Sequence, residues 1–234
     1  MTRVHHLAIA AKNPGELADF YRRAMDLQIL RENDSATVLS DGAIELVLLS
    51  GRNPGLDHIG FQVEQADTLR QIFDKSLTKA ACRVGLDGEP CTEFRVTDPD
   101  GNAVHFFAEG SPPAKNQSPF PIRHIALYTP DPQRLAEFYG GLFQMRKVSD
   151  TDRASIFVSD GYLNLALLSQ RPEEGLGLHH FGFHVRNIRE TQQRLVEEGV
   201  GAGDQRPSRI PYAEYRILDP EGNGFDISQK GWKA

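Results

Sequence analysis

Two stretches of the sequence are nearly the same nine residues: GLDHIGFQV at 55–63 and GLHHFGFHV at 177–185. Each has a histidine in fourth place, His58 and His180. The likeness extends outward, since VHHLAIAAKNPGELADFYRRAMDLQIL (4–30) matches IRHIALYTPDPQRLAEFYGGLFQMRKV (122–148) and EFRVTDPDGNAVHFF (93–107) matches EYRILDPEGNGFDIS (214–228). Such self-similarity is the mark of a duplicated unit. The sequence therefore predicts two homologous domains, 1–110 and 120–234, with a Pro- and Ser-rich linker at 111–119.

Each half reads as strand, helix and further strands, used twice. Residues 4–10 alternate like a half-buried strand, and 14–25 carry apolar residues at helical spacing, with Asn13 as N-cap and Pro14 at the first helical position. Strands at 36–40 and 43–50 flank an Asp-Gly turn signal. The second unit has a strand at 58–63, a helix at about 66–79, and strands at 93–97 and 102–107. This is a βαβββ plan repeated four times, an α+β fold.

Composition is that of an ordinary soluble protein. The 234 residues are 39% hydrophobic and 25% charged, with a formal net charge of −6, which gives no reason to expect nucleic-acid binding. No apolar run approaches the roughly 20 residues of a membrane span, and the N-terminus lacks a signal-peptide pattern. The two cysteines, Cys82 and Cys91, read as reduced thiols, so we expect a cytoplasmic protein.

The histidines fall on one face of their strands. Because side chains alternate along a strand, His58 and Gly60 lie opposite the large apolar residues at 59, 61 and 63. His6 in the first half, and His124 and His180 in the second, follow the same rule. The apolar face should pack under the helices, so the histidines should line a cavity; His5 and His179, one residue earlier, should face away.

The sequence resembles the vicinal oxygen chelate superfamily, which includes glyoxalase I, extradiol dioxygenases and bleomycin resistance proteins. The resemblance rests on the strand histidines, the "FY" of the first helix, the "HxxF" of the second unit and the "DPDGN" and "DPEGN" turns. It implies that each domain is a pair of βαβββ units forming a curved, mostly antiparallel sheet around a cavity. It also implies small-molecule substrates, and a homodimer is one expectation, although a fused pair of domains can replace it.

In the resembled family, metal ligands lie at four strand positions. Carried over, they are His124, His180 and Asp226 in the second half, with Asn164 at the remaining position, and His6, His58, His105 and Glu45 in the first. The second half is preferred, because two histidines and one carboxylate suit non-haem Fe(II) and two-domain ring-cleaving relatives keep metal only in the C-terminal domain. The first half suits zinc, nickel or iron. We expect a divalent metal, Fe(II) first and Mn, Zn or Ni as alternatives, and assign no residue to an organic cofactor.

Three further residues are candidates for catalysis. Arg216, like Arg95 in the first half, can bind a carboxylate or phosphate if it faces the cavity, which suggests an anionic or aromatic substrate. His184 shares a strand face with His180 and can act as general acid or base. Tyr128 lines the same cavity by parity. The alternatives are a solvated arginine and a packing histidine.

Three functions remain open. The first is an Fe(II)-type oxidoreductase resembling extradiol dioxygenases, acting on a small aromatic or vicinal-oxygen substrate. The second is a glyoxalase- or epimerase-like lyase or isomerase, which Glu45 supports. The third is a non-catalytic protein that binds a small molecule such as an antibiotic, which His105 supports because the family usually has a carboxylate at that position.

Overall fold

The computed structural model describes residues 2–52, 55–63, 81–83, 93–107, 117–150, 155–170, 175–207 and 212–234. The first half contains β1 (Arg3–Ala11), α1 (Pro14–Met25), β2 (Gln28–Asn33), β3 (Ala36–Ser40), β4 (Glu45–Ser50), β5 (Gly55–Gln62), β6 (Ala81–Arg83), β7 (Glu93–Thr97) and β8 (Ala103–Phe107). The second contains β9 (Ile122–Thr129), α3 (Pro132–Phe143), β10 (Arg146–Asp150), β11 (Ile156–Ser159), β12 (Asn164–Ser169), β13 (Gly177–His184), α4 (Ile188–Glu197), β14 (Asp204–Gln205), β15 (Tyr215–Leu218) and β16 (Gly224–Ser228).

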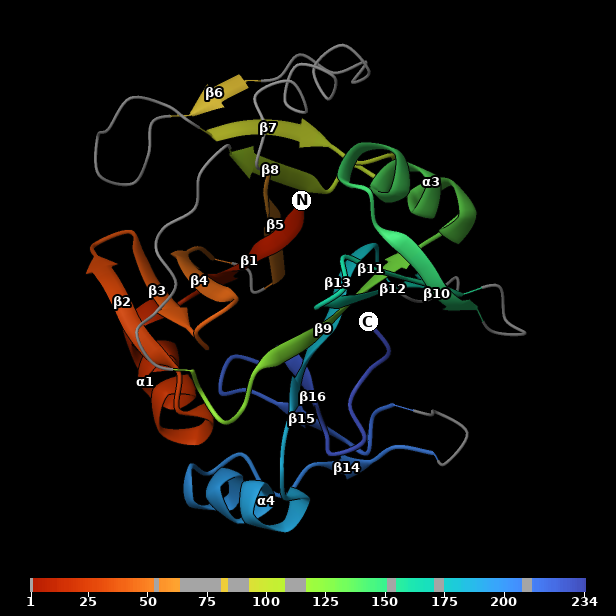
Figure 1. The fold of residues 1–234 in the computed structure, drawn as a ribbon. Coiled ribbons are helices and arrows are strands. Elements are labelled where there is room, and N and C mark those ends of the chain that lie inside the picture. Colours follow the sequence, from red (N-terminus) through yellow and green to blue (C-terminus); the bar gives the residue numbers. More distant parts are fainter. Residues whose placement is uncertain are drawn as a thin grey trace.

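Each half forms one 8-stranded sheet, and the two sheets have the same strand order (Figure 1). The first is ordered β2-β3-β4-β1-β5-β8-β7-β6 and the second β10-β11-β12-β9-β13-β16-β15-β14. In the first sheet β1 pairs with β4, and β5 with β8, in parallel, while the other neighbours are antiparallel. The predicted α+β fold, with two homologous, mostly antiparallel sheets, is confirmed.

The two halves share one hydrophobic core. On α1, Tyr21 lies with its ring centroid 6.0 Å from those of Phe181 and Phe225, which belong to the second sheet. On α3, the ring of Phe143 stacks on Phe61 of the first sheet at 4.0 Å. α1 also packs on β2, β3 and β4 of its own half, and α3 packs on β10, β11 and β12. Both helices therefore lie between the two sheets. Burying these apolar faces is the main stabilising contribution to the fold.

Hydrogen bonds cross between the halves in matched pairs. The buried Tyr21 hydroxyl donates to Asp219 at 2.7 Å, and the Tyr139 hydroxyl donates to Asp98 at 3.1 Å. Asp98 and Asp219 also accept backbone N–H groups within their own DPDGN and DPEGN turns. The "FY" and "DPxGN" motifs are therefore partners across the pseudo-symmetric interface.

A second matched pair fixes the first strand of each half. The backbone N–H of Val4 donates to the Asp160 carboxylate at 2.7 Å, and that of Ile122 donates to Asp41 at 2.6 Å. Both aspartates lie in the turns that the sequence marks as SDG. Each turn therefore holds the start of the other half's first strand as well as closing its own hairpin.

Several local predictions hold and some need correction. α1 begins at Pro14 as predicted, but the Asn13 side chain makes no capping bond; instead, the N–H groups of Lys12 and Asn13 donate to Glu221 of the other half. β4 begins at Glu45 rather than at 43, because Asp41 ties residues 43 and 44 into the preceding turn. The helix expected at 66–79, most of the linker, and the side chains of both cysteines lie outside the described residues.

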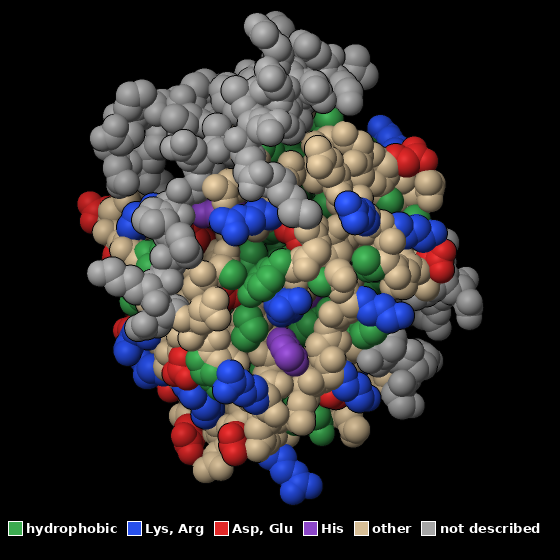
Figure 2. Space-filling model, in the orientation of Figure 1, with side chains coloured by type: hydrophobic (Ala, Val, Ile, Leu, Met, Phe, Trp, Pro, Cys, Tyr) green, Lys and Arg blue, Asp and Glu red, His purple; other side chains and the backbone are tan. Residues whose placement is uncertain are grey.

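The described surface carries basic, acidic and apolar side chains together (Figure 2). The described helices are too short and too polar for any of them to cross a membrane. Cytoplasmic location, absence of nucleic-acid binding and a homodimer stay predictions.

Candidate metal centre

One row of residues crosses the middle of each sheet. In the first half, backbone pairing aligns Glu45 (β4) with His6 (β1), His6 with Gly60 (β5), Gly60 with His105 (β8), and His105 with Arg95 (β7). The matching row in the second half is Asn164, His124, Gly182, Asp226 and Arg216. Register thus places side chains far apart in sequence on one line, and a glycine at its centre leaves room above the sheet.

The imidazoles of His6, His58 and His105 converge over the first row. The Nε2 atoms of His6 and His58 are 2.9 Å apart, and the rings of His58 and His105 stack with centroids 3.7 Å apart. Of the described residues, these three bring one ligand atom each to within 4.8 Å of one another. All three are buried, and burial, with the neighbouring imidazoles, holds the pKa of His6 well below its usual value.

A carboxylate fixes the tautomer of His58. Its Nδ1–H donates to Asp57 at 2.7 Å, which leaves the lone pair of a neutral ring on Nε2. This hydrogen bond lowers the pKa of Asp57. A carboxylate behind a histidine is the usual second-sphere support of a metal ligand.

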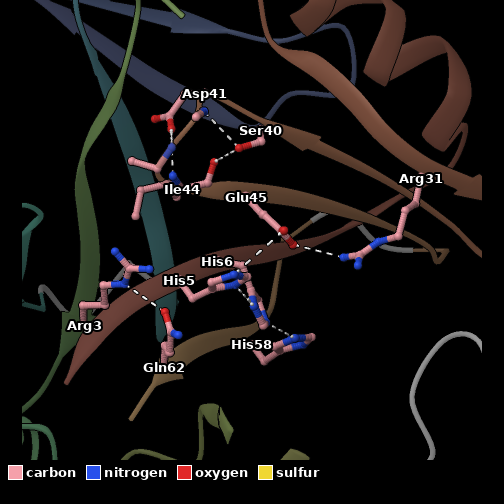
Figure 3. A network of polar contacts seen from close by, with 12 residues as sticks. Arg3, His5, His6, Arg31, Ser40, Asp41, Ile44, Glu45, His58 and Gln62 are labelled. Atoms are coloured by element: carbon pink, nitrogen blue, oxygen red, sulfur yellow. Dashed lines mark hydrogen bonds and ion pairs between the residues drawn. The ribbon is translucent and has the colours of Figure 1, made fainter. Parts of the chain in front are cut away.

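His6 is followed by a chain of polar contacts through His5, Glu45 and Arg31 (Figure 3). The Nδ1 atoms of His5 and His6 are 3.2 Å apart, and His5 Nε2 is 3.9 Å from Oε1 of Glu45. The other Glu45 oxygen accepts from Arg31 at 3.2 Å, while burial raises the Glu45 pKa. When the N–H of His5 faces the Glu45 carboxylate, its Nδ1 accepts from His6, so the His6 lone pair also falls on Nε2. Glu45 therefore lies behind His5 rather than with the converging imidazoles.

The prediction that His5 and His179 face away from the cavity is wrong. Pairing of β1 with β5 shifts register between Val4 and His6, and pairing of β13 with β9 shifts between Leu178 and His180. Such β-bulges add a residue on one strand and break the strict alternation of faces. A third shift, between Leu56 and His58, does the same for Asp57. The bulges thus turn three supporting side chains toward the row of ligands.

In the second half, His124, His180 and Asp226 lie together but with other partners. Asn164 donates to the Lys233 carbonyl at 2.7 Å and accepts from His124 Nδ1 at 3.0 Å. Nε2 of His180 lies 3.2 Å from Oδ2 of Asp226. Burial lowers the pKa of His124 to about 3 and that of His180 to about 4.

The Asp226 carboxylate is bound by Arg216, the residue opposite it on β15. Arg216 Nε donates to one carboxylate oxygen, and Nη2 donates to the other at 3.0 Å. Burial alone would raise the Asp226 pKa, but the charges and hydrogen bonds of His180 and Arg216 outweigh it and hold the pKa far below its usual range. Both oxygens that a metal would need are already engaged.

Tyr128 and His184, the other catalytic candidates, differ in position. The Tyr128 hydroxyl lies 3.2 Å from His179 Nε2, and the two rings stack. Arg216 Nη1 also approaches His179, at 3.3 Å, so Tyr128 belongs to the Asp226 network. His184 instead donates to the backbone carbonyl of Gln229 at 3.3 Å.

Sequence reasoning missed two participants. Asp57 has one local signal, an acidic residue directly before a strand histidine. Trp232, which stacks on His124 with the two rings only 5° from parallel, has none, because it follows the last strand.

Comparison with solved structures agrees with this arrangement of two similar curved sheets. The structure is similar to a 2,3-dioxygenase, LapB, from Pseudomonas sp. KL28 (TM-score 0.79, 20% identity, covering 98% of this chain and 92% of that one). It is similar to a Mn(II)-bound glyoxalase from Novosphingobium aromaticivorans (0.80, 17%, 98% and 83%). It is also similar to an extradiol ring-cleaving dioxygenase from B. fuscum (0.79, 20%, 98% and 72%). At these identities the likeness establishes the fold.

Residues 3–106 and 122–227 match the family model of the Glyoxalase/Bleomycin resistance protein/Dioxygenase superfamily. The chain belongs to this superfamily, whose members include metal-dependent enzymes. No curated protein gives a significant match to the sequence.

Proposed function

We propose that the chain is a metal-dependent enzyme whose divalent metal is held in the first half by His6, His58 and His105. The observation that carries this is the convergence of three buried imidazoles, which bring one ligand nitrogen each to within 4.8 Å of one another, with the Nε2 atoms of His6 and His58 2.9 Å apart. When both rings are neutral and carry their protons on Nδ1, the two Nε2 lone pairs repel each other unless a cation binds both. This replaces the second half, which the sequence preferred, as the proposed metal site.

The donor set fits a Lewis-acidic metal. Three neutral imidazoles leave the whole charge of a divalent ion uncompensated, as in catalytic His₃ zinc sites, and imidazole also suits nickel and iron. The bound metal would polarise the oxygen atoms of a small substrate. Asp57 and the His5–Glu45 pair orient the ligands from behind.

Two arginines favour an anionic substrate. The positive charge of Arg31 contributes to lowering the pKa of His6 and opposes the burial that raises the pKa of Glu45. That of Arg95 contributes to lowering the pKa of Asp57. Guanidinium groups near a metal that binds oxygen atoms suit a carboxylate or another oxyanion.

The reaction that this donor set favours is redox-neutral, of the glyoxalase or isomerase type. Within the part of the chain that the structure describes, no carboxylate joins the three imidazoles, whereas oxygen-activating iron sites characteristically use two histidines and one carboxylate. A ring-cleaving dioxygenase is the second candidate, favoured by the match of nearly the whole chain to such enzymes.

Metal analysis of protein purified without a histidine tag tests the proposal. We expect about one zinc or nickel per chain, lost in His58→Ala and His105→Ala. Hydrogen–deuterium exchange at the carbon next to the carbonyl of a panel of α-hydroxycarbonyl and 2-oxoaldehyde–thiol compounds would support the isomerase type. Iron together with oxygen uptake on catechols would support the dioxygenase. Absence of bound metal, with ligand binding intact in His58→Ala, would instead identify a binding protein.

A further inference from the structure

The residue that faces the arginine, on β8 in one half and on β16 in the other, differs chemically between the two halves. Arg95 pairs with His105 in the first sheet and Arg216 pairs with Asp226 in the second. An imidazole cannot accept two parallel guanidinium bonds, whereas a carboxylate can. One residue difference between the duplicated halves therefore decides whether the arginine binds across the row.

The resulting pair in the second half is buried. Asp226 is 1% exposed, and the side chain of Arg216 is 12% exposed. A buried bidentate pair is costly to break, because separating it leaves an uncompensated charge. The guanidinium supplies the positive charge that a metal would bring and occupies the oxygen atoms that would bind it.

The C-terminal segment fills the space beside this pair. The Trp232 ring lies parallel to His124 with centroids 4.9 Å apart, and the Lys233 carbonyl accepts from Asn164. A Cβ at Gly182 would lie 2.7 Å from the indole, so the central glycine of the row makes room for this ring. In Figure 1 the C-terminus returns to the vicinity of β9 and β12, the strands of His124 and Asn164.

We propose that the second half is a site closed by the chain itself, with Arg216 in the place of a metal and Trp232 in the place of a bound planar molecule. The chain then binds one metal, in the first half, and the second site becomes a metal site when Arg216 is removed. This proposal concerns the second half and does not require that the first half catalyse any particular reaction.

Titration of metal-free full-length protein with Zn²⁺ tests the stoichiometry. We expect one equivalent in the wild type, none in His58→Ala and one in His124→Ala. Arg216→Met should bind two equivalents, and His58→Ala/Arg216→Met should regain one. Arg189→Met, an exposed arginine on α4, is the matched control and should bind one.

The only tryptophan of the chain gives a second readout. Zn²⁺ should leave the fluorescence of Trp232 unchanged in the wild type and shift it to the red in Arg216→Met, because the metal draws His124 away from the indole. Two equivalents in the wild type, or loss of the equivalent in His124→Ala, would overturn the proposal. The proposal would also be overturned if Arg216→Met has the melting temperature of the wild type and binds only one equivalent of Zn²⁺. If Arg216→Met does not fold, the comparison of His124→Ala with His58→Ala still decides. If the wild type binds no metal, the proposed metal site in the first half fails, whereas binding by His58→Ala/Arg216→Met would still support closure of the second.

Discussion

Replacing Gly60 by alanine should remove His6 from the proposed metal centre. A Cβ built at Gly60 would overlap the imidazole of His6, with Cε1, Nε2 and Nδ1 as its nearest atoms. The neighbours cannot yield easily, because Gly60 is buried and paired on both sides. To reach ordinary van der Waals contact the ring has to move by roughly 1 Å, more than the about 0.5 Å that a preorganised site tolerates.

The size of the effect follows from the loss of one ligand in three. Removing only a second-sphere partner of a metal ligand lowers affinity about 10- to 100-fold. Displacing the ligand itself should therefore weaken binding at least 100-fold, or about 2.7 kcal/mol. The free energy of unfolding should fall by less than this. Overpacking costs about 1–3 kcal/mol, but replacing a glycine within a strand returns about 0.5–1 kcal/mol.

Gly182→Ala is the matched control, since it changes the same position in the other half. Its Cβ meets Trp232 rather than a ligand of the proposed metal. Zn²⁺ affinity, measured by competition with a chromogenic chelator, should stay within about twofold of the wild type, while Trp232 fluorescence changes. The reasoning is refuted if Gly60→Ala has the melting temperature of the wild type and binds Zn²⁺ as tightly as the wild type does.

Three further predictions follow from the contacts. Asp57→Asn should weaken Zn²⁺ binding by about 10- to 100-fold, measured by the same competition; unchanged affinity would exclude Asp57 as the support of His58. Tyr139→Phe should lower the free energy of unfolding by about 1–3 kcal/mol in urea, because it leaves Asp98 with one donor fewer; a loss within error would show that the bond does not hold the halves together. Burial raises the pKa of Tyr21 and Tyr139 well above the usual 10, so the stability that their neutral form contributes is complete below pH 10 and falls as pH rises above it. Tyr21→Phe/Tyr139→Phe should flatten that alkaline loss in pH-dependent melting, and an equally steep loss would assign it to other groups.

The elements were predictable where a regular pattern had one interpretation. The strand of Val4–Ala10 and the helix from Pro14 follow from periods of two and 3.6 residues, and both exist. β2 (Gln28–Asn33) was not separately predicted, because it is largely exposed and shows no apolar run. The pattern of α1 also showed that Tyr21 is buried, but periodicity cannot say against which sheet, and the partner is Asp219, 198 residues away.

The side-chain environment of the site was less predictable. Alternation placed His6 and His58 on one face, and the family resemblance added His105, but alternation fails at a bulge, and three bulges supply His5, Asp57 and His179. A bulge depends on the pairing of two strands, so one strand's sequence does not reveal it. The pairing of Arg216 with Asp226 likewise depends on register across a hairpin.

In the two proposals, one ligand position distinguishes the metal centre of the first half from the closed site of the second. Both keep the first and second histidines and the central glycine. In the first half the last position is His105, so the residue paired with Arg95 is an imidazole and not a carboxylate, and three imidazoles converge. Where it is Asp226, the residue that better resembles an iron ligand, it attracts the arginine directly opposite and is neutralised. We therefore expect a carboxylate in the ligand position to bind a metal only if no guanidinium lies opposite it in the sheet, so the residue paired with it across the strands has to be considered together with the ligand motif.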